Sequence, residues 1–103
     1  MLQITQRRQE GTLIAVYTGE LDHHAARAAI EQTEDLLVLF PCEKLVLDLS
    51  ELTFMDSSGI GIIIGRYKKI SYFGGKVFVI NTDTRIKKSL MICGLHKIIE
   101  IME

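Results

Sequence analysis

Residues 52–65, LTFMDSSGIGIIIG, decide the fold, because a pair of serines there separates a strand-like run from a helix-like run. Asp56 and Ser57 can cap the helix, and Ser58 lies just inside its first turn. The first N–H groups of a helix lack internal partners and carry partial positive charge, so a phosphate on Ser58 would be stabilised there. The apolar residues after the serines recur at steps of three and four, which is the spacing of one helix face. They are Ile60, Ile63, Ile64, Tyr67 and Ile70.

Three glycines interrupt this helix, at Gly59, Gly61 and Gly65. Each disfavours the helix by about 1 kcal/mol relative to alanine, so each needs a compensating reason. A close approach by a neighbouring strand or by a partner surface would supply one. Neither G-x-x-x-x-G-K-[ST] nor G-x-G-x-x-G is present, so the glycines indicate a nucleotide site only weakly.

The size and charge of the chain exclude several classes of protein. The chain has 103 residues, of which 48% are hydrophobic. This length and composition predict a single domain, residues 1–103, with one core. The net charge is −1, the pI is about 6.3, and no run of lysine or arginine exceeds two residues. These values argue against a nucleic-acid partner.

No targeting or metal-binding pattern is recognisable in the sequence. The apolar runs are too short to span a membrane, and residues 1–20 lack the apolar core of a signal peptide. We therefore expect a soluble, cytoplasmic protein with no membrane contact. Cys42 and Cys93 have neither metal-ligand spacing nor the density of a disulfide scaffold, so we expect reduced thiols, no metal and no cofactor.

Around the serine segment, the pattern predicts an α/β protein. Strands at 2–6 and 12–18 would form a hairpin, and a helix capped by Asp22 would run to residue 40 before Pro41. The run at 44–50, KLVLDLS, is typical of a central strand covered on both faces. After the serine helix come a turn at Gly74–Gly75, a strand at 76–80, a helix closed by Gly94, and a strand at 97–101. The cap of that last helix is Asn81, Thr82 or Asp83.

This order, strand, strand, helix, strand, helix, strand, helix, strand, predicts a mixed but mostly parallel sheet. In the helix at 22–40 we expect a buried stripe, and charged side chains elsewhere on the helices are expected to be solvated. The stripe is Ala26, Ala29, Ile30, Thr33, Leu37 and Phe40. The charged set includes Glu34, Arg66, Lys68, Lys69, Arg85, Lys87 and Lys88.

The polar residues give little support for a catalytic function. Ser57 or Ser58 with His23 or His24 could suggest a hydrolase, but the G-x-S-x-G elbow and an acidic orienting residue are missing. Asp48 resembles a phospho-acceptor of receiver domains, yet the acidic pair expected after a first strand is absent. A carboxylate satisfied at the end of its strand is the simpler interpretation.

Several segments, taken together, closely resemble the anti-sigma factor antagonists of the STAS family. They are GELDHH at 19–24, LVLDLS at 45–50, LTFMDSSGIG at 52–61, GRYK at 65–68, GGKV at 74–77 and CGLHKII at 93–99. The match follows the order of the chain over nearly its whole length. The motifs GELDHH and TFMDSSG most resemble those of the sporulation member, which acts on the anti-sigma factor of sigma-F.

The resemblance implies a STAS fold with four to five strands and about three helices, and a switch that is not an enzyme. The unphosphorylated protein would bind an anti-sigma factor that is also a serine kinase, and would thereby release the sigma factor. Phosphorylation of the serine before the glycine, Ser58, would stop this binding. ATP and Mg would come with the kinase, and a PP2C-type serine phosphatase would reactivate the protein. The resemblance also implies, for some members, weak nucleotide binding by the antagonist itself. The surface for the partner would comprise Asp22, Asp56, Ser57, Ser58, Gly59 and Gly61.

One departure from the family concerns the C-terminal end. Family members usually continue into a further helix, whereas this sequence ends at Glu103, directly after the last predicted strand. If that helix covers part of the sheet, we expect exposed apolar surface, lower stability or self-association without it. An alternative function is a STAS scaffold or nucleotide-sensing module of a stressosome-like assembly, and a second is an enzyme that uses Ser58.

Overall fold

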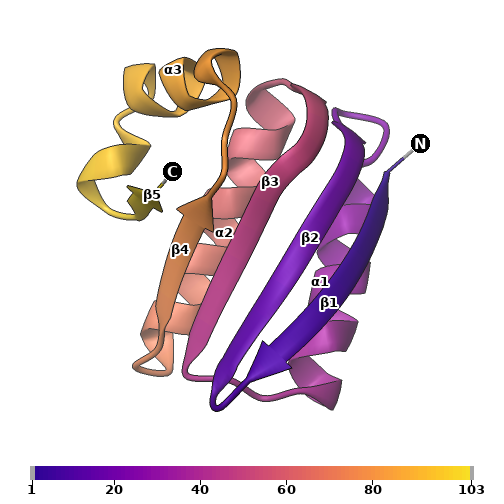
Figure 1. Cartoon of the computed structure of the whole chain (residues 1–103), viewed down its shortest axis with the longest axis vertical. Coiled ribbons are helices and arrows are strands. Elements are labelled where there is room, and N and C mark those ends of the chain that lie inside the picture. Colours follow the sequence, from indigo (N-terminus) through magenta and orange to yellow (C-terminus); the bar gives the residue numbers. More distant parts are fainter. Residues whose placement is uncertain (1, 103) are drawn as a thin grey trace.

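A computed structural model describes residues 2–102 as one five-stranded sheet with helices packed on it. The order of strands and helices is the predicted one, with a short 3-10 helix added before the last strand (Figure 1). The elements are β1 (Gln3–Gln9), β2 (Thr12–Leu21), α1 (Ala26–Leu39), β3 (Lys44–Met55), α2 (Ser57–Tyr72), β4 (Lys76–Ile80), α3 (Thr84–Ile92), η1 (Leu95–Lys97) and β5 (Glu100–Met102).

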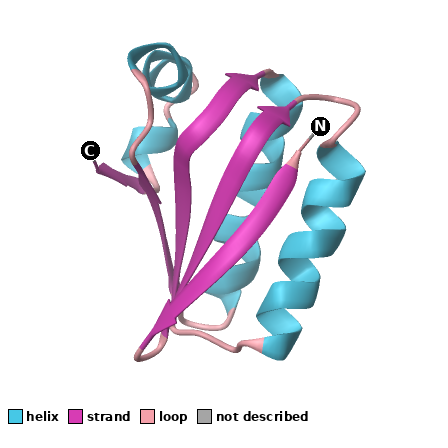
Figure 2. Ribbon diagram, turned by 45° about the vertical axis from the view of Figure 1, so that its right-hand side comes forward, coloured by secondary structure: helices cyan, strands magenta, loops and turns pink. Residues whose placement is uncertain are grey.

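The sheet has the strand order β1-β2-β3-β4-β5, which confirms β3 as the central strand. β1 pairs with β2 in antiparallel fashion, and the three other pairs are parallel. Parallel strands joined by right-handed crossovers place their helices on one face when the strand order moves in one direction. Accordingly, α1 and α2 lie side by side on the same face of the sheet and run in the same direction (Figure 2).

The core lies between this face of the sheet and the two helices. Leu45, Leu47 and Leu49 of β3 are almost fully buried there, whereas Val46, on the opposite face, is half-buried. Asp48, on the same face as Val46, is buried, so the prediction that β3 is covered on both faces is confirmed only in part for the second face. Tyr17 of β2 and Thr33 of α1, both fully buried, join their hydroxyls in a hydrogen bond across this core.

The first three strands are longer than predicted, and the first helix is shorter. β3 continues five residues past Ser50, and its register against β2 shifts twice along the way. β-Bulges of this kind bend a strand and re-aim its side chains, so the sequence alternation is lost there. α1 begins only at Ala26, because Asp22 caps a separate turn by accepting a hydrogen bond from the backbone N–H of Ala25.

The C-terminal elements differ from the prediction in one place. Asp83 caps α3 through the N–H of Ile86 at 2.8 Å, and Gly94 follows the helix with φ of 77°, as expected for a glycine that ends a helix. The last strand, predicted at 97–101, begins only at Glu100, because Lys97 is the final residue of η1, which also contains His96. The apolar pair Ile98 and Ile99, which suggested an earlier start of the strand, lies in the connection between η1 and β5.

Two side chains of the helices lie where the sequence did not predict them. Ile30, expected in the buried stripe of α1, is exposed. Arg66, expected in solvent, is only 8% exposed and pairs with Glu34 of α1, which also binds Lys69. A long aliphatic stem lets arginine pack between helices while its charge is neutralised, and polarity alone does not predict this.

Candidate functional site

The start of α2 is built around the carboxylate of Asp56. Its Oδ1 accepts hydrogen bonds from the backbone N–H groups of Ser58, at 2.9 Å, and Gly59, at 3.4 Å. Its Oδ2 accepts a third from the N–H of His23, at 3.2 Å. Asp56 is thus the helix cap, as predicted, whereas Ser57 is the first residue of the helix.

The link from His23 to Asp56 brings the loop after β2 against the serine segment. Asp22 precedes His23 in this loop, and its Oδ1 accepts the N–H of Ala25 at 2.9 Å. Asp22 and Asp56 therefore lie on neighbouring loops at the same end of the molecule, where β2 and β3 finish (Figure 1). The sequence predicted this proximity only through the resemblance, since the two residues are far apart along the chain.

The two serines differ in exposure. Ser57 is exposed, whereas Ser58 is half-buried. The N–H groups of Ser58 and Gly59, which were expected to be free for a phosphate, already donate to Asp56. A phosphate on either serine would therefore compete with the carboxylate of Asp56 for these N–H groups, and the two negative charges would repel each other.

The glycines of α2 have different surroundings. A methyl group on Gly59 would lie 2.4 Å from Cγ of Met55 and 2.8 Å from the carbonyl oxygen of Leu21. Gly59 is therefore explained by internal packing against the ends of β2 and β3, the first of the two predicted reasons. Gly61 and Gly65 would have no such neighbour within 4 Å, so their surface is open.

Two hollows lie near the ends of β2 and β3. One, of about 340 Å³, includes Asp22, and the other, of about 170 Å³, includes Met55 next to Asp56. The first is lined by Leu2, Glu20, Asp22, His24, Ala25 and Ala28, and the second by Thr53, Phe54, Met55, Arg85, Ile86 and Ser89. Phe54 is an exposed aromatic residue here. Neither Phe54 nor the proximity of α3 was predicted from the sequence, because the bulges of β3 change which of its side chains point outward.

The geometry offers little for catalysis at the serines. The rings of His23 and His24 contact one another edge to face, with centroids 5.8 Å apart. Within residues 2–102, no hydrogen bond joins either histidine ring to Ser57 or Ser58, and no cluster of three or more metal-ligating side chains is present. No helix in this part of the chain is both long enough and apolar enough to cross a membrane.

Asp48 is buried and satisfied, as predicted, but it lies within β3 and not at its end. Its carboxylate accepts from the N–H of Ser50 at 3.0 Å and from the amide of Asn81 at 3.3 Å, with Arg7 3.9 Å away. These partners offset the free-energy cost of burying the carboxylate of Asp48.

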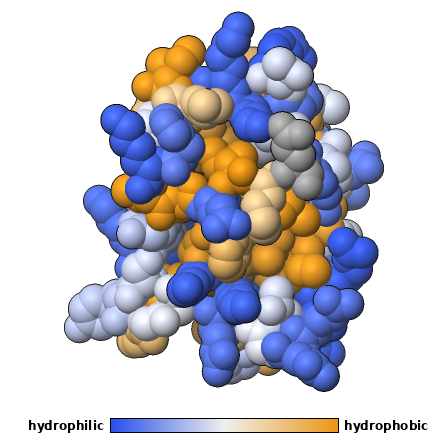
Figure 3. All heavy atoms as spheres, turned by 60° about the vertical axis from the view of Figure 1, so that its left-hand side comes forward, coloured by the Kyte–Doolittle hydropathy of each residue, from blue (hydrophilic) through white to orange (hydrophobic). Residues whose placement is uncertain are grey.

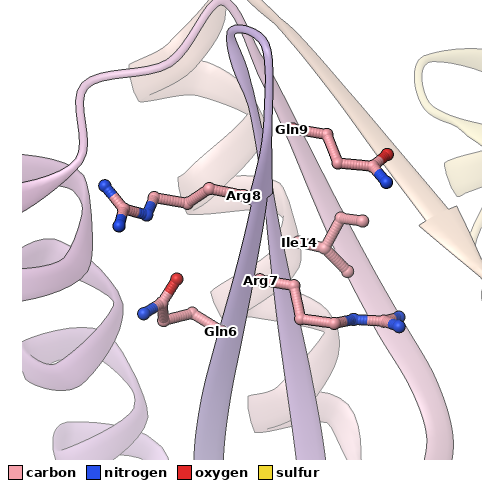
Figure 4. A pocket seen from close by; sticks show the side chains of 5 residues that line it. All are labelled: Gln6, Arg7, Arg8, Gln9 and Ile14. Atoms are coloured by element: carbon pink, nitrogen blue, oxygen red, sulfur yellow. The ribbon is translucent and has the colours of Figure 1, made fainter.

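Two further surfaces lie away from the serine site, one beside β1 and one beside β4 and β5. The hollow beside β1 is bordered by side chains that point to opposite faces of the sheet: Gln6 and Arg8 toward the helices, and Arg7, Gln9 and Ile14 away from them (Figure 4). These side chains enclose no common cavity. On the side where β4 and β5 end the sheet, apolar side chains gather into a broad patch (Figure 3). A hollow of about 330 Å³ there includes Tyr67, Val77 and Ile98.

Known proteins are similar to this chain in sequence and in fold. Residues 3–103 match the STAS domain. The chain is 40% identical to the anti-sigma F factor antagonist of Paenibacillus polymyxa over 99% of its own length and 87% of the relative's. An anti-sigma factor antagonist from Mycobacterium paratuberculosis has a TM-score of 0.88 at 22% identity, covering 99% of this chain and 86% of that one. The Bacillus cell fate determinant SpoIIAA in its phosphorylated form has a TM-score of 0.73 at 24% identity, covering 98% and 90%. The fold predicted from the resemblance is confirmed.

Proposed function

Because this chain belongs to the STAS domain family, we propose that it acts as an anti-sigma factor antagonist. In this role the protein binds an anti-sigma factor and so frees the sigma factor. The identity to the Paenibacillus antagonist over nearly the whole chain supports the proposal and makes sigma-F the proposed sigma factor. The structural observation that carries it is the exposed Ser57 at the start of α2, beside the loop of Asp22 and the two hollows.

The partner surface we propose surrounds this end of the molecule. Asp22 and Asp56 supply negative charge, Ser57 and Ser58 supply hydroxyls, and Gly61 leaves open space on the outer face of α2. Gly59 contributes indirectly, because its close packing holds the start of α2 against β2 and β3. Phe54, exposed beside the smaller hollow, adds an apolar contact of the kind that anchors protein interfaces.

Phosphorylation of the serine pair is the proposed off-switch, with the anti-sigma factor acting as an ATP- and Mg-dependent serine kinase. A phosphoserine carries a charge of about −1.5 to −2 at neutral pH. Since Asp56 already occupies the nearest N–H groups, the phosphate would project toward the partner and add to the charge of two aspartates. The bound complex would lose affinity while the fold of the antagonist stays unchanged. A PP2C-type serine phosphatase would remove the phosphate and restore binding.

The choice of serine is part of the proposal. The resemblance points to Ser58, but a kinase needs access to the hydroxyl, and Ser57 is the more exposed of the two. We therefore extend the proposal from Ser58 to the pair. Replacing each serine separately by alanine distinguishes them.

The test is phosphorylation by the cognate anti-sigma kinase with Mg-ATP, followed by intact mass and phosphopeptide mapping. We expect one phosphate on the wild-type protein, none on the variant that lacks the acceptor serine, and one on the other single variant. No phosphate on the wild-type protein, with a kinase active toward another substrate, would refute the switch.

Affinity for the anti-sigma factor provides a second test. The alanine variant of the acceptor serine should bind as tightly as the wild-type protein, and the aspartate variant at least about tenfold more weakly. Ser71→Asp is a matched control, because Ser71 lies near the opposite end of the same helix. If Ser71→Asp weakens binding as much, the effect is not specific to the serine pair and the switch is wrong.

A further inference from the structure

The outer faces of α1 and α2, which point away from the sheet, carry exposed apolar side chains near their C-terminal ends. Val38 and Leu39 of α1 are 77% and 68% exposed, and Tyr72 of α2 and Phe73 after it are 83% and 76% exposed. A 103-residue domain gains nothing for its own core from four large side chains in solvent. They lie at the C-terminal ends of α1 and α2, whereas the serine pair lies at the start of α2. The two ends of these helices lie at opposite ends of the molecule (Figure 2).

The ion pairs between the helices fix the relative height of these side chains. Glu34 binds both Arg66 and Lys69, so position 34 of α1 is level with positions 66–69 of α2. One helical turn spans about 3.6 residues, so Val38 is level with Tyr72 and Phe73. By the same offset, Asp35 is level with Lys68.

The two outer faces carry charges of opposite sign. The exposed face of α1 presents Arg27 in its first turn and then Glu31 and Asp35. The outer face of α2 presents Lys68 and no acidic residue, since the two other cations of this helix, Arg66 and Lys69, are paired with Glu34. Within residues 2–102, neither Asp35 nor Lys68 takes part in an ion pair. On the stripe of α2 that includes Lys68 and Tyr72, Gly65 leaves space for another backbone to approach.

We propose that these faces form a two-fold interface between two copies of this chain. A two-fold axis parallel to the helices sets α1 of one copy against α2 of the other at unchanged height. Asp35 then meets Lys68 of the second copy, Val38 meets Tyr72 of the second copy, and each contact occurs twice. Opposite charges and apolar groups are both matched in this arrangement, which makes a second copy the fitting occupant of the surface.

The proposal is independent of the proposed function, because it needs no anti-sigma factor. The test is sedimentation equilibrium of the isolated full chain. We expect a weak dimer, with a Kd of about 100 μM. A chain that stays monomeric up to about 1 mM would refute the interface.

Charge reversal tests the geometry. Asp35→Lys or Lys68→Asp alone should weaken the dimer at least about tenfold, because each places two like-charged pairs in the interface. The double variant should restore the wild-type Kd to within about threefold, since the pairs are then reversed but still opposite. Failure of the double variant to restore the dimer would overturn the pairing.

Ile92→Asp is the matched control, because Ile92 of α3 is 80% exposed but lies outside the proposed interface. It should leave the Kd unchanged, whereas Tyr72→Asp should weaken it at least about tenfold. Equal effects of the two substitutions would mean that any exposed apolar residue drives association, and would refute the proposal. Circular dichroism of each variant verifies that the fold is retained.

Discussion

The two faces of α2 differ in burial, although they belong to one helix. The face toward the sheet contains Gly59, Ile63 and Ile70, together with Arg66 against α1, all of them buried. The outer face contains Ser57, Gly61, Lys68 and Tyr72, all of them exposed. Residue type does not separate the faces, because each has a glycine and a cation. What separates them is whether a side chain has neighbours in the same chain.

This difference has a consequence for function. The inner face holds the start of α2 in place against β2 and β3, and therefore positions the serine pair. The outer face does not pack against the sheet, so its residues are available to bind partners. Substitutions of matched residues on the two faces should separate stability from binding.

The largest effect is expected for Gly59→Ala. The added methyl group would approach the carbonyl oxygen of Leu21 to 2.8 Å, and backbone cannot move away as a side chain can. Overpacking of this kind outweighs the better helix propensity of alanine, and we expect a net loss of about 2–3 kcal/mol in the free energy of unfolding. Urea denaturation followed by circular dichroism measures this loss. An unchanged midpoint would show that the contact of α2 with β2 relaxes readily.

A smaller effect is expected for Arg66→Met at neutral pH. The substitution keeps the packing of the stem but removes one partner of Glu34, whose carboxylate is partly exposed. We expect a loss of about 1–2 kcal/mol, below the value for a fully buried pair. Lys69→Met, which removes the more exposed partner of Glu34, should cost less.

The pH dependence of this loss tests its electrostatic origin. Burial of Glu34 alone would raise the pKa of its carboxyl, but Lys69 and Arg66 outweigh burial and hold the pKa below its ordinary value. A depressed carboxyl pKa contributes stability above the unfolded pKa of about 4.3, and this stability is lost as the pH falls through the folded pKa. The cost of Arg66→Met should therefore shrink as the pH is lowered below about 4. A cost that is independent of pH would assign the effect to packing.

Much of the inner face could be predicted from the sequence, and much of the outer face could not. The spacing of Ile63 and Ile70 predicted the helix, and Asp56 its cap, because both signals are local. The predicted exposure of Arg66 and the predicted burial of Ile30 were wrong, because the burial of both side chains depends on how α1 and α2 pack on each other. The difference between Ser57 and Ser58 was also missed. It depends on the direction in which the cap turns the chain, and two identical residues in sequence carry no signal for it.

Gly61→Ala is expected to have the smallest effect on stability, and an effect of opposite sign. Its methyl group would meet nothing within 4 Å, so the better helix propensity of alanine should raise the free energy of unfolding by about 0.5–1 kcal/mol. Gly65→Ala, with the same open surroundings one turn further on, is the matched control and should give a similar gain.

Binding to the anti-sigma factor then distinguishes the two outer glycines. If the partner packs against the outer face near the serine pair, Gly61→Ala should weaken binding by about tenfold while the fold gains stability, because a methyl group enters a close contact. Gly65→Ala, one turn further from Ser57, should bind within about threefold of the wild-type protein. Gly59→Ala, by contrast, should lose stability and binding together. A Gly61→Ala variant with unchanged affinity would confine the partner to the loops of Asp22 and Asp56 and leave the outer face of α2 to other contacts.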